Sequence, residues 1–189
     1  MKRFQIINAL LSVLLLAVAL GASTPTIANA ATATVIDKEV DLALEKLYAS
    51  TPAAQELAKI SKAVLVFPDV VKAGLVIGGQ YGEGALRVEG KTIGYYNTVA
   101  ASYGLQAGAQ TFGYAMFLMN DEALKYLQKS EGWEVGIGPT VVVMDEGMAK
   151  SLTSSTAKDD IYAFIFGQKG LMAGIGLQGS KITRINPDK

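Results

Sequence analysis

The stretch from Gly74 to Gly84, Gly-Leu-Val-Ile-Gly-Gly-Gln-Tyr-Gly-Glu-Gly, mixes β-branched and aromatic residues with closely spaced glycines. The same texture continues upstream in Lys62-Ala-Val-Leu-Val-Phe-Pro68 and downstream in Gly104-Leu-Gln-Ala-Gly-Ala-Gln110. Of the 20 glycines, all but Gly21 lie between Gly74 and Gly179. Glycine weakens helices and strands, so this density is tolerated where backbones approach closely or adopt unusual dihedral angles. We therefore expect a tightly packed, glycine-rich β core.

The first 30 residues are expected to be a secretory signal peptide. Lys2 and Arg3 precede an apolar run from Ile6 to Ala22, and Ala28-Asn29-Ala30 supplies a small-x-small cleavage site. The alternative is that the apolar run is retained as a membrane anchor. We expect cleavage after Ala30 and export to the periplasm or cell envelope. Because the chain has no cysteine, it offers no lipobox for a lipid-modified N-terminus.

The remaining residues, 31–189, have the size of a single domain with its own core. Without Lys2 and Arg3, 15 basic and 17 acidic residues remain, which gives a net charge of about −2. A chain without basic excess is not attracted to nucleic acid by simple electrostatics. The lack of cysteine excludes disulfide bonds, and no later apolar run is long enough for a membrane-spanning helix.

Two amphipathic helices are predicted at the start of this domain. In residues 34–49, Thr34 and Asp37 form the expected N-terminal cap. The apolar residues at helical spacing are Ile36, Val40, Leu44 and Leu47. The polar face of this segment is net acidic, so we expect it to pack on the domain's own core rather than on a membrane. Pro52 begins a second helix that ends near Ser61.

After Ser61 the pattern becomes that of strands, roughly eight to ten in number, with a hairpin turn at Glu89-Gly90. The predicted strands span 63–67, 70–77, 80–88, 92–98, 104–119, 133–137, 140–144, 161–166, 171–177 and 181–185. A short helix capped by Asn120 or Asp121 is expected to end near Lys129, and residues 147–159 form either a loop or a short helix. The predicted fold class is α+β: two N-terminal helices packed on a large, mainly antiparallel, glycine-rich sheet that is curled or barrel-like.

A Gly-Leu-x-x-Gly frame recurs within the predicted strands. Its copies are Gly74–Gly78, Gly104–Gly108 and Gly170–Gly174, with a looser one at Gly132–Gly136. Residues i and i+4 share one face of a strand, so each copy presents two glycines to the same side. Either these are ordinary strands with glycines at bends, or they form a side-chain-free groove for a helix or an acyl chain. The second interpretation makes Gly78, Gly108 and Gly174 candidate contact residues.

The side-chain inventory argues against catalysis. The chain has no histidine and no cysteine, which removes the usual nucleophile–base pairs and the commonest transition-metal ligands. Adjacent carboxylates such as Asp121-Glu122 are expected in turns and helix caps. Residues 85–92 loosely imitate a phosphate-binding loop, but strand residues follow where the nucleotide site requires a helix. We therefore expect no enzyme activity, metal, cofactor or nucleotide.

Five lysines border the predicted strands and turns of the core: Lys62, Lys72, Lys91, Lys169 and Lys181. If two or three of them converge beside an apolar slot, they suit a phosphate headgroup. The alternative is scattered charge that serves solubility. Trp133 is a candidate lining residue of such a slot, although aromatic residues in strands are usually core.

Six blocks in the same order closely resemble the SYLF domain family, over residues 42–185. The blocks begin at Lys62 (KAVLVFP), Lys72 (KAGLVIGGQYGEG), Tyr95 (YYN), Gly104 (GLQAGAQ), Gly132 (GWEVGIGP) and Tyr162 (YAFIFGQKGL). The resemblance implies a lipid-binding module and not an enzyme. Eukaryotic members bind phosphoinositides and membranes, some also associate with actin, and exported bacterial members are taken to be envelope lipid-binding proteins.

The acidic helix at residues 34–49 differs from the basic N-terminal segment that helps eukaryotic members bind phosphoinositides. Lipid class and partner are therefore not carried over. We expect a phospholipid or membrane surface as partner, contacted through an apolar, glycine-lined surface. The alternative is a structural or assembly protein of the envelope that binds another protein through its glycine-rich strands.

Overall fold

A computed structural model describes residues 31–129, 132–144, 157–170 and 179–188, without the side chains of Val76 and residues 103–107. Residues Ala31–Lys189 form one compact unit and are described by themselves. The predicted strand 171–177 and most of the segment 147–159 lie outside the described residues.

The first two predicted helices are confirmed. Helix α2 spans Ala33–Ser50 and buries Ile36, Val40, Ala43 and Leu47, while α3 spans Pro52–Ile60 with its proline in the first turn. The predicted cap at Thr34 is wrong, because Thr32 Oγ1 accepts the amide hydrogen bond of Val35 at 3.4 Å. Asp37 instead accepts hydrogen bonds from Thr92 Oγ1 and Tyr95 on the sheet, at 2.6 and 2.9 Å.

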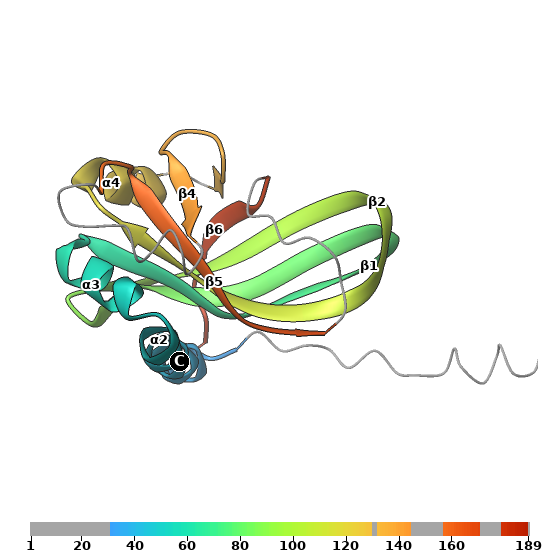
Figure 1. Cartoon of the computed structure of the whole chain (residues 1–189), viewed down its shortest axis with the longest axis horizontal. Coiled ribbons are helices and arrows are strands. Elements are labelled where there is room, and N and C mark those ends of the chain that lie inside the picture. Colours follow the sequence, from blue (N-terminus) through green and yellow to red (C-terminus); the bar gives the residue numbers. More distant parts are fainter. Residues whose placement is uncertain (1–30, 130–131, 145–156, 171–178, 189) are drawn as a thin grey trace, which may run out of the picture. The chain divides into compact units, whose positions relative to one another are not determined.

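Two very long strands form the centre of the fold (Figure 1). Strand β1 spans Ala63–Val88, and β2 spans Lys91–Leu118 and pairs with it antiparallel along its whole length. The predicted turn lies at Glu89 (φ 49°) and Gly90 (φ 77°), the positive dihedrals of a tight hairpin turn. Five predicted strands therefore merge into two. Pro68-Asp69 does not end a strand as expected; it forms an irregularity between the pairs of Phe67 and Val70.

The hairpin folds back on itself near Leu75 and Ile77, where the pairing with β2 shifts (Figure 1). A Cβ built on Gly74 would lie 2.5 Å from Gly78 Cα, so these two glycines meet on the inside of the bend. Further along, a Cβ on Gly82 would lie 2.9 Å from Asp69 O, and one on Gly84 would collide with Val66 O. The two halves of β1 therefore cross in close backbone contact, which only glycine permits.

The remaining strands continue the two layers of the folded hairpin. Residues Tyr95–Val99 of β2 pair with β6 (Lys181–Ile185), which pairs with the short β3 (Trp133–Glu134). Residues Gln110–Leu118 of β2 pair with β5 (Ile161–Gly170), and β4 (Val141–Met144) adds to β5 in parallel. The mainly antiparallel, curled sheet and the α+β class are confirmed. Strand β3 is shorter than the predicted strand 133–137 because the chain turns after Glu134. The Ile137 amide donates a hydrogen bond to Glu134 O at 3.0 Å across this turn.

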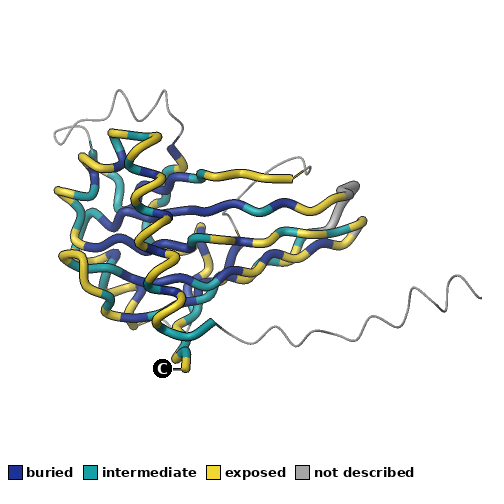
Figure 2. The backbone as a smooth tube through the Cα atoms, turned by 90° about the horizontal axis from the view of Figure 1, so that it is seen from below, coloured by how far each residue is buried: buried dark blue, intermediate teal, exposed yellow. Residues whose placement is uncertain are grey.

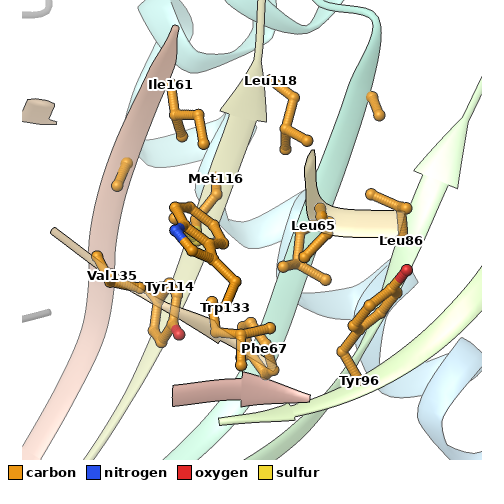
Figure 3. Packing of buried hydrophobic residues seen from close by; sticks show 14 of the residues in the cluster. Leu65, Phe67, Leu86, Tyr96, Tyr114, Met116, Leu118, Trp133, Val135 and Ile161 are labelled. Atoms are coloured by element: carbon orange, nitrogen blue, oxygen red, sulfur yellow. The ribbon is translucent and has the colours of Figure 1, made fainter. Parts of the chain in front are cut away.

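Two apolar clusters occupy opposite faces of this sheet. On the inner face, between the layers, Leu65, Phe67, Tyr96, Tyr114 and Met116 pack with Trp133, as Figure 3 shows. Helix α4 (Asp121–Lys129) adds to this cluster and begins where Asn120 Oδ1 accepts the Ala123 amide hydrogen bond at 2.8 Å.

On the outer face, Val64, Val66, Ala85, Phe117 and Phe164 pack against α2 and α3. The helices cover only the end of the hairpin that lies near its turn and its termini (Figure 1). We call this end, residues 63–70, 82–98 and 112–118, the proximal half. Residues 71–81 and 99–111, around the bend, form the distal half.

Candidate functional site

In the distal half, the usual polarity of a sheet is inverted. Along β1 the exposed, outward positions are apolar or small, and they are Val71, Ala73, Leu75, Ile77, Gly79 and Tyr81. The alternate positions, which are partly or fully buried, include Lys72 and Gln80. A strand with one solvated face normally places polar residues outward, whereas apolar-outward alternation is typical of strands that face lipid.

The exposure of these apolar side chains is large. Leu75 is 74% exposed and Ile77 is 69% exposed, on either side of the bend. Val71, Tyr81 and Val99 are each about half exposed. Figure 2 shows the alternation of exposed and buried residues continuing toward the bend. We call the set of Val71, Ala73, Leu75, Ile77, Tyr81 and Val99 the apolar bend. Large exposed apolar patches on a protein mark interaction sites.

Behind the apolar bend, the space between the layers holds buried polar side chains. Gln80 Nε2 donates a hydrogen bond to Ser180 Oγ at 3.3 Å. The buried Gln110 Oε1 has no hydrogen-bond partner among the residues that the structure describes, and the hydroxyl groups of Thr98 and Tyr114 are buried next to this space, at the border with the proximal half. Burial raises the pKa of Tyr114, so this phenol stays neutral. The inner face of the distal half is thus polar and the outer face apolar.

Two of the five predicted lysines flank the apolar bend. Residues paired directly across strands share a face. Val71 pairs with Thr111, which pairs with Lys169 on β5. On the other layer, Tyr81 pairs with Val99, which pairs with Lys181 on β6. Each layer therefore carries an outward row that runs from an apolar residue at the bend to an exposed lysine.

The other three predicted lysines lie elsewhere. Lys72 pairs with Gln110 and points to the inner face, opposite to Lys169. Lys62 lies 3.8 Å from Asp121 at the start of α4, and Lys91 follows the hairpin turn. The structure therefore does not gather the five lysines into one cluster.

The three glycines predicted to contact lipid lie in different surroundings. Gly78 is buried on the inside of the bend, facing Gly74. Gly108 is exposed, pairs with Gly74 and has φ 141°, a conformation that a side chain would strain. Gly174 lies outside the described residues. The space beside Gly74 that a side chain would occupy is filled by backbone atoms of Ile77 and Gly78. A lipid contact at these glycines stays a prediction.

Trp133 is a core residue. Its side chain is buried in the inner cluster, and its Nε1 donates a hydrogen bond to Ile137 O at 2.9 Å (Figure 3). The indole packs edge-on against Tyr126 of α4, with ring centroids 6.4 Å apart. Trp133 thus fixes α4 to the sheet and does not line the apolar bend.

Two hollows in the described part of the chain are too small for a phospholipid. One of about 200 Å³ lies between α2 and the sheet, lined by Glu39, Lys46, Asp69 and Lys169 among others. Another of about 180 Å³ lies between α2 and the hairpin turn, beside Arg87. Ligand pockets usually measure about 300–1,000 Å³. Both hollows are smaller than that range.

Neither membrane-spanning helices nor metal clusters occur in the described ranges. No helix there has the length and apolarity to cross a membrane. The same residues contain no group of three acidic side chains placed to hold a metal ion.

Comparison with known proteins adds a family. The family described as "Ysc84: Las17-binding protein actin regulator", the SYLF family, matches residues 99–187. This match agrees with the resemblance to the SYLF family over residues 99–187. The SYLF match contains the β2 side of the distal half, together with β5 and β6 and therefore Lys169 and Lys181. Strand β1 precedes it, although the pairing with β2 makes the two strands one hairpin. No curated protein matches the chain.

Sequence reasoning missed the apolar bend, yet the sequence holds a signal for it. No charged residue occurs between Lys91 and Asp121, and Lys72 is the only one between Asp69 and Glu83. Both strands therefore pass through the distal half with one charge in total. Apolar β-branched residues there were assigned to the core, because alternation along a strand does not show which face is covered.

Proposed function

We propose that this chain is a non-enzymatic phospholipid-binding protein of the bacterial cell envelope, which contacts a membrane with its apolar bend. The observation that carries the proposal is the inverted polarity of the distal half: apolar side chains outward, polar side chains inward. The resemblance to lipid-binding SYLF domains supports it, and the family match over residues 99–187 supports it further.

The hydrophobic term is large enough for membrane association. Burying a leucine or isoleucine side chain fully is worth about 1.5–3 kcal/mol. Leu75 and Ile77, at 74% and 69% exposure, would each gain about 1–2 kcal/mol on that scale. The two together would contribute about 30-fold or more in affinity. Tyr81 adds an amphipathic ring of the type enriched at membrane–water interfaces.

Lys169 and Lys181 supply the polar half of the contact. They end the two outward rows, one on each layer of the folded hairpin. When the bend enters the acyl region, these side chains reach the phosphate level from both sides. Each lysine near an anionic membrane surface contributes about 1 kcal/mol, and salt screens this attraction.

Vesicle flotation of residues 31–189 tests the proposal. The vesicles contain either phosphatidylethanolamine with phosphatidylglycerol or phosphatidylcholine alone. We expect the protein to float with the mixed vesicles and the double variant Leu75→Asp/Ile77→Asp to remain at the bottom. Ile137→Asp is the matched control, since Ile137 is also exposed, at 58%, but lies outside the bend. Flotation of the double variant at the level of the unmodified protein would refute the proposal.

A second candidate is protein binding at the same surface. The family description names a protein partner, Las17, for other members, and an exposed apolar face serves protein contacts equally. This candidate predicts no flotation with either vesicle type. It also predicts a stoichiometric envelope partner that co-purifies with the unmodified chain and is lost in Leu75→Asp/Ile77→Asp. Flotation of the unmodified protein that is lost in Leu75→Asp/Ile77→Asp would exclude protein binding as the main function of this surface.

A further inference from the structure

The amide nitrogen of Ala31 contacts a carboxylate far away in the sequence. Ala31 N donates a hydrogen bond to Glu83 Oε2 at 3.1 Å, across 52 residues and in a partly buried position. The side chain of Ala31 packs against the outer apolar cluster. Two residues later, the Ala33 amide donates to Asp188 O at 2.9 Å. The segment that leads into α2 is therefore fixed to the sheet at its first described residue.

The surroundings of this nitrogen are acidic. The second oxygen of Glu83 accepts a hydrogen bond from the Tyr81 hydroxyl at 2.5 Å. Burial, followed by the negative charges of Asp69 and Glu83, raises the pKa of Glu39 on α2. A carboxylate with other acidic groups near it thus accepts the hydrogen bond of a neutral N–H donor, although such a carboxylate suits a cation better than an amide.

Ala31 is also the residue that follows the small-x-small site Ala28-Asn29-Ala30. We propose that Glu83 is the docking site for the α-ammonium group that cleavage after Ala30 creates on Ala31. Hydrolysis of this bond consumes one water molecule and leaves a carboxylate on Ala30 and an ammonium on Ala31. The inference rests on the export that the proposed function assumes, because an endopeptidase of the export route must cut there.

The charge changes what the contact is worth. An amide offers one neutral donor, whereas an ammonium offers three donors and a full positive charge, and charge-assisted hydrogen bonds are roughly twice as strong. Glu83 therefore raises the pKa of the α-amino group above its ordinary value of about 7.7–8.0. A group whose pKa is raised on folding stabilises the fold below its unfolded pKa. This stabilisation is lost as the pH rises through the folded pKa.

The titratable group that contacts this nitrogen is Glu83 of β1. Tyr81 of β1 donates a hydrogen bond to Glu83, and Glu39 of α2 lies within reach of the charges of Asp69 and Glu83. Asp188, in the C-terminal segment, accepts the Ala33 amide hydrogen bond through its backbone carbonyl. Burial together with the Glu83 hydrogen bond raises the pKa of Tyr81 to about 12. An α-amino group ordinarily titrates at about 7.7–8.0, so a raised value lies between neutrality and the pKa of Tyr81.

The direct test measures the pKa of the Ala31 α-amino group by NMR titration. The protein is residues 31–189, released from a fusion whose removal leaves no extra residue. We expect a pKa raised by about one unit, a tenfold higher proton affinity, that returns to the ordinary value in Glu83→Gln. Glu89→Gln, in the exposed hairpin turn, is the control and leaves the pKa raised. An ordinary pKa in the unmodified protein would overturn the inference.

A second measurement does not depend on the folding of the Glu83 variant. Acetylation of Ala31 keeps the N–H donor and removes the charge. We expect the acetylated protein to unfold at a lower temperature than the free amine at pH 7, with the difference vanishing by pH 10. Equal unfolding temperatures at pH 7 contradict the inference. Intact-mass measurement of the exported protein separates a failure of cleavage from a failure of Glu83 to bind the ammonium.

Discussion

The two halves of the β1–β2 hairpin use the same strands in opposite ways. In the proximal half each face carries a buried apolar cluster, the inner one covered by Trp133 and α4 and the outer one by α2 and α3. In the distal half the inner face is polar, and the apolar outer face is open. Whether an apolar face of the sheet is covered therefore depends on where the helices lie, since the same two strands run through both halves. An apolar residue stabilises the fold in one half and is available for binding in the other.

The largest expected difference between the halves is in the cost of deleting an apolar side chain. Phe67→Ala in the proximal half removes a fully buried ring that stacks near Tyr114, with centroids 4.8 Å apart. We expect a loss of about 3–5 kcal/mol in the free energy of unfolding. Leu75→Ala in the distal half changes it by less than about 0.5 kcal/mol. Denaturant unfolding measures both, and equal losses would show that the apolar bend is covered within the domain.

A pair of glycines tests the close contact of the two halves of β1. Gly84→Ala forces a methyl group into Val66 O and near the Phe67 ring, so we expect a loss of about 1–3 kcal/mol. At Gly79, in the distal half, a methyl group would meet only Ala100 O, at 4.0 Å. Gly79→Ala should therefore be neutral or stabilising by up to about 1 kcal/mol. Thermal unfolding compares the two; tolerance of Gly84→Ala would contradict the crossing of the strand on itself.

The flanking lysines sharpen the comparison on the binding side. Lys169→Gln and Lys181→Gln should each weaken binding to anionic vesicles about fivefold at low salt, from about 1 kcal/mol per lysine. Lys62→Gln and Lys91→Gln, in or next to the proximal half, serve as matched controls and should leave binding unchanged. Titration with vesicles at low and high salt measures this. An equal effect of all four substitutions would point to unspecific attraction.

The smallest effect concerns the carboxylate of Asp160 beside the proximal half. Hydrogen bonds from the Thr140 amide and hydroxyl and from Asn120 Nδ2, at 2.8–2.9 Å, lower its pKa. A lowered pKa stabilises the fold above the unfolded value, and the gain is lost as the pH falls through the folded value. Asp160→Asn should therefore cost less than about 1 kcal/mol at pH 7. The difference from the unmodified protein should disappear well below pH 4, in thermal unfolding followed across pH.

Local features were predictable because they depend on neighbouring residues. The spacing of Ile36, Val40 and Leu47 fixed the buried face of α2, and Glu89-Gly90 gave the hairpin turn. Phe112, Tyr114 and Met116 alternate along the sequence, and this period of two places them on one core face of β2. In each case a short segment contains the periodicity or the dihedral requirement that decides the outcome.

The candidate site was not predictable in the same way. Period-two alternation assigns residues to two faces of a strand, but it does not tell which face another element covers. Leu75 and Ile77 therefore looked like core residues, and their neighbours Gly74 and Gly78 looked like a groove. The five candidate lysines were predicted because they border strands and turns. Only the pairing of Lys169 with Thr111 and of Lys181 with Val99 shows that these two flank the apolar bend and the other three do not.

The sequence by itself determined the helices, the hairpin, the glycine-rich β core and the lack of histidine and cysteine. The tertiary structure decided that β1, which would extend for about 85 Å if straight, folds over at Gly74 and Gly78. It also decided the coverage, because the 18-residue helix α2 extends for about 27 Å and lies over the proximal half. The reason is that bending and coverage depend on contacts between residues far apart in the chain, and these contacts leave the apolar bend exposed.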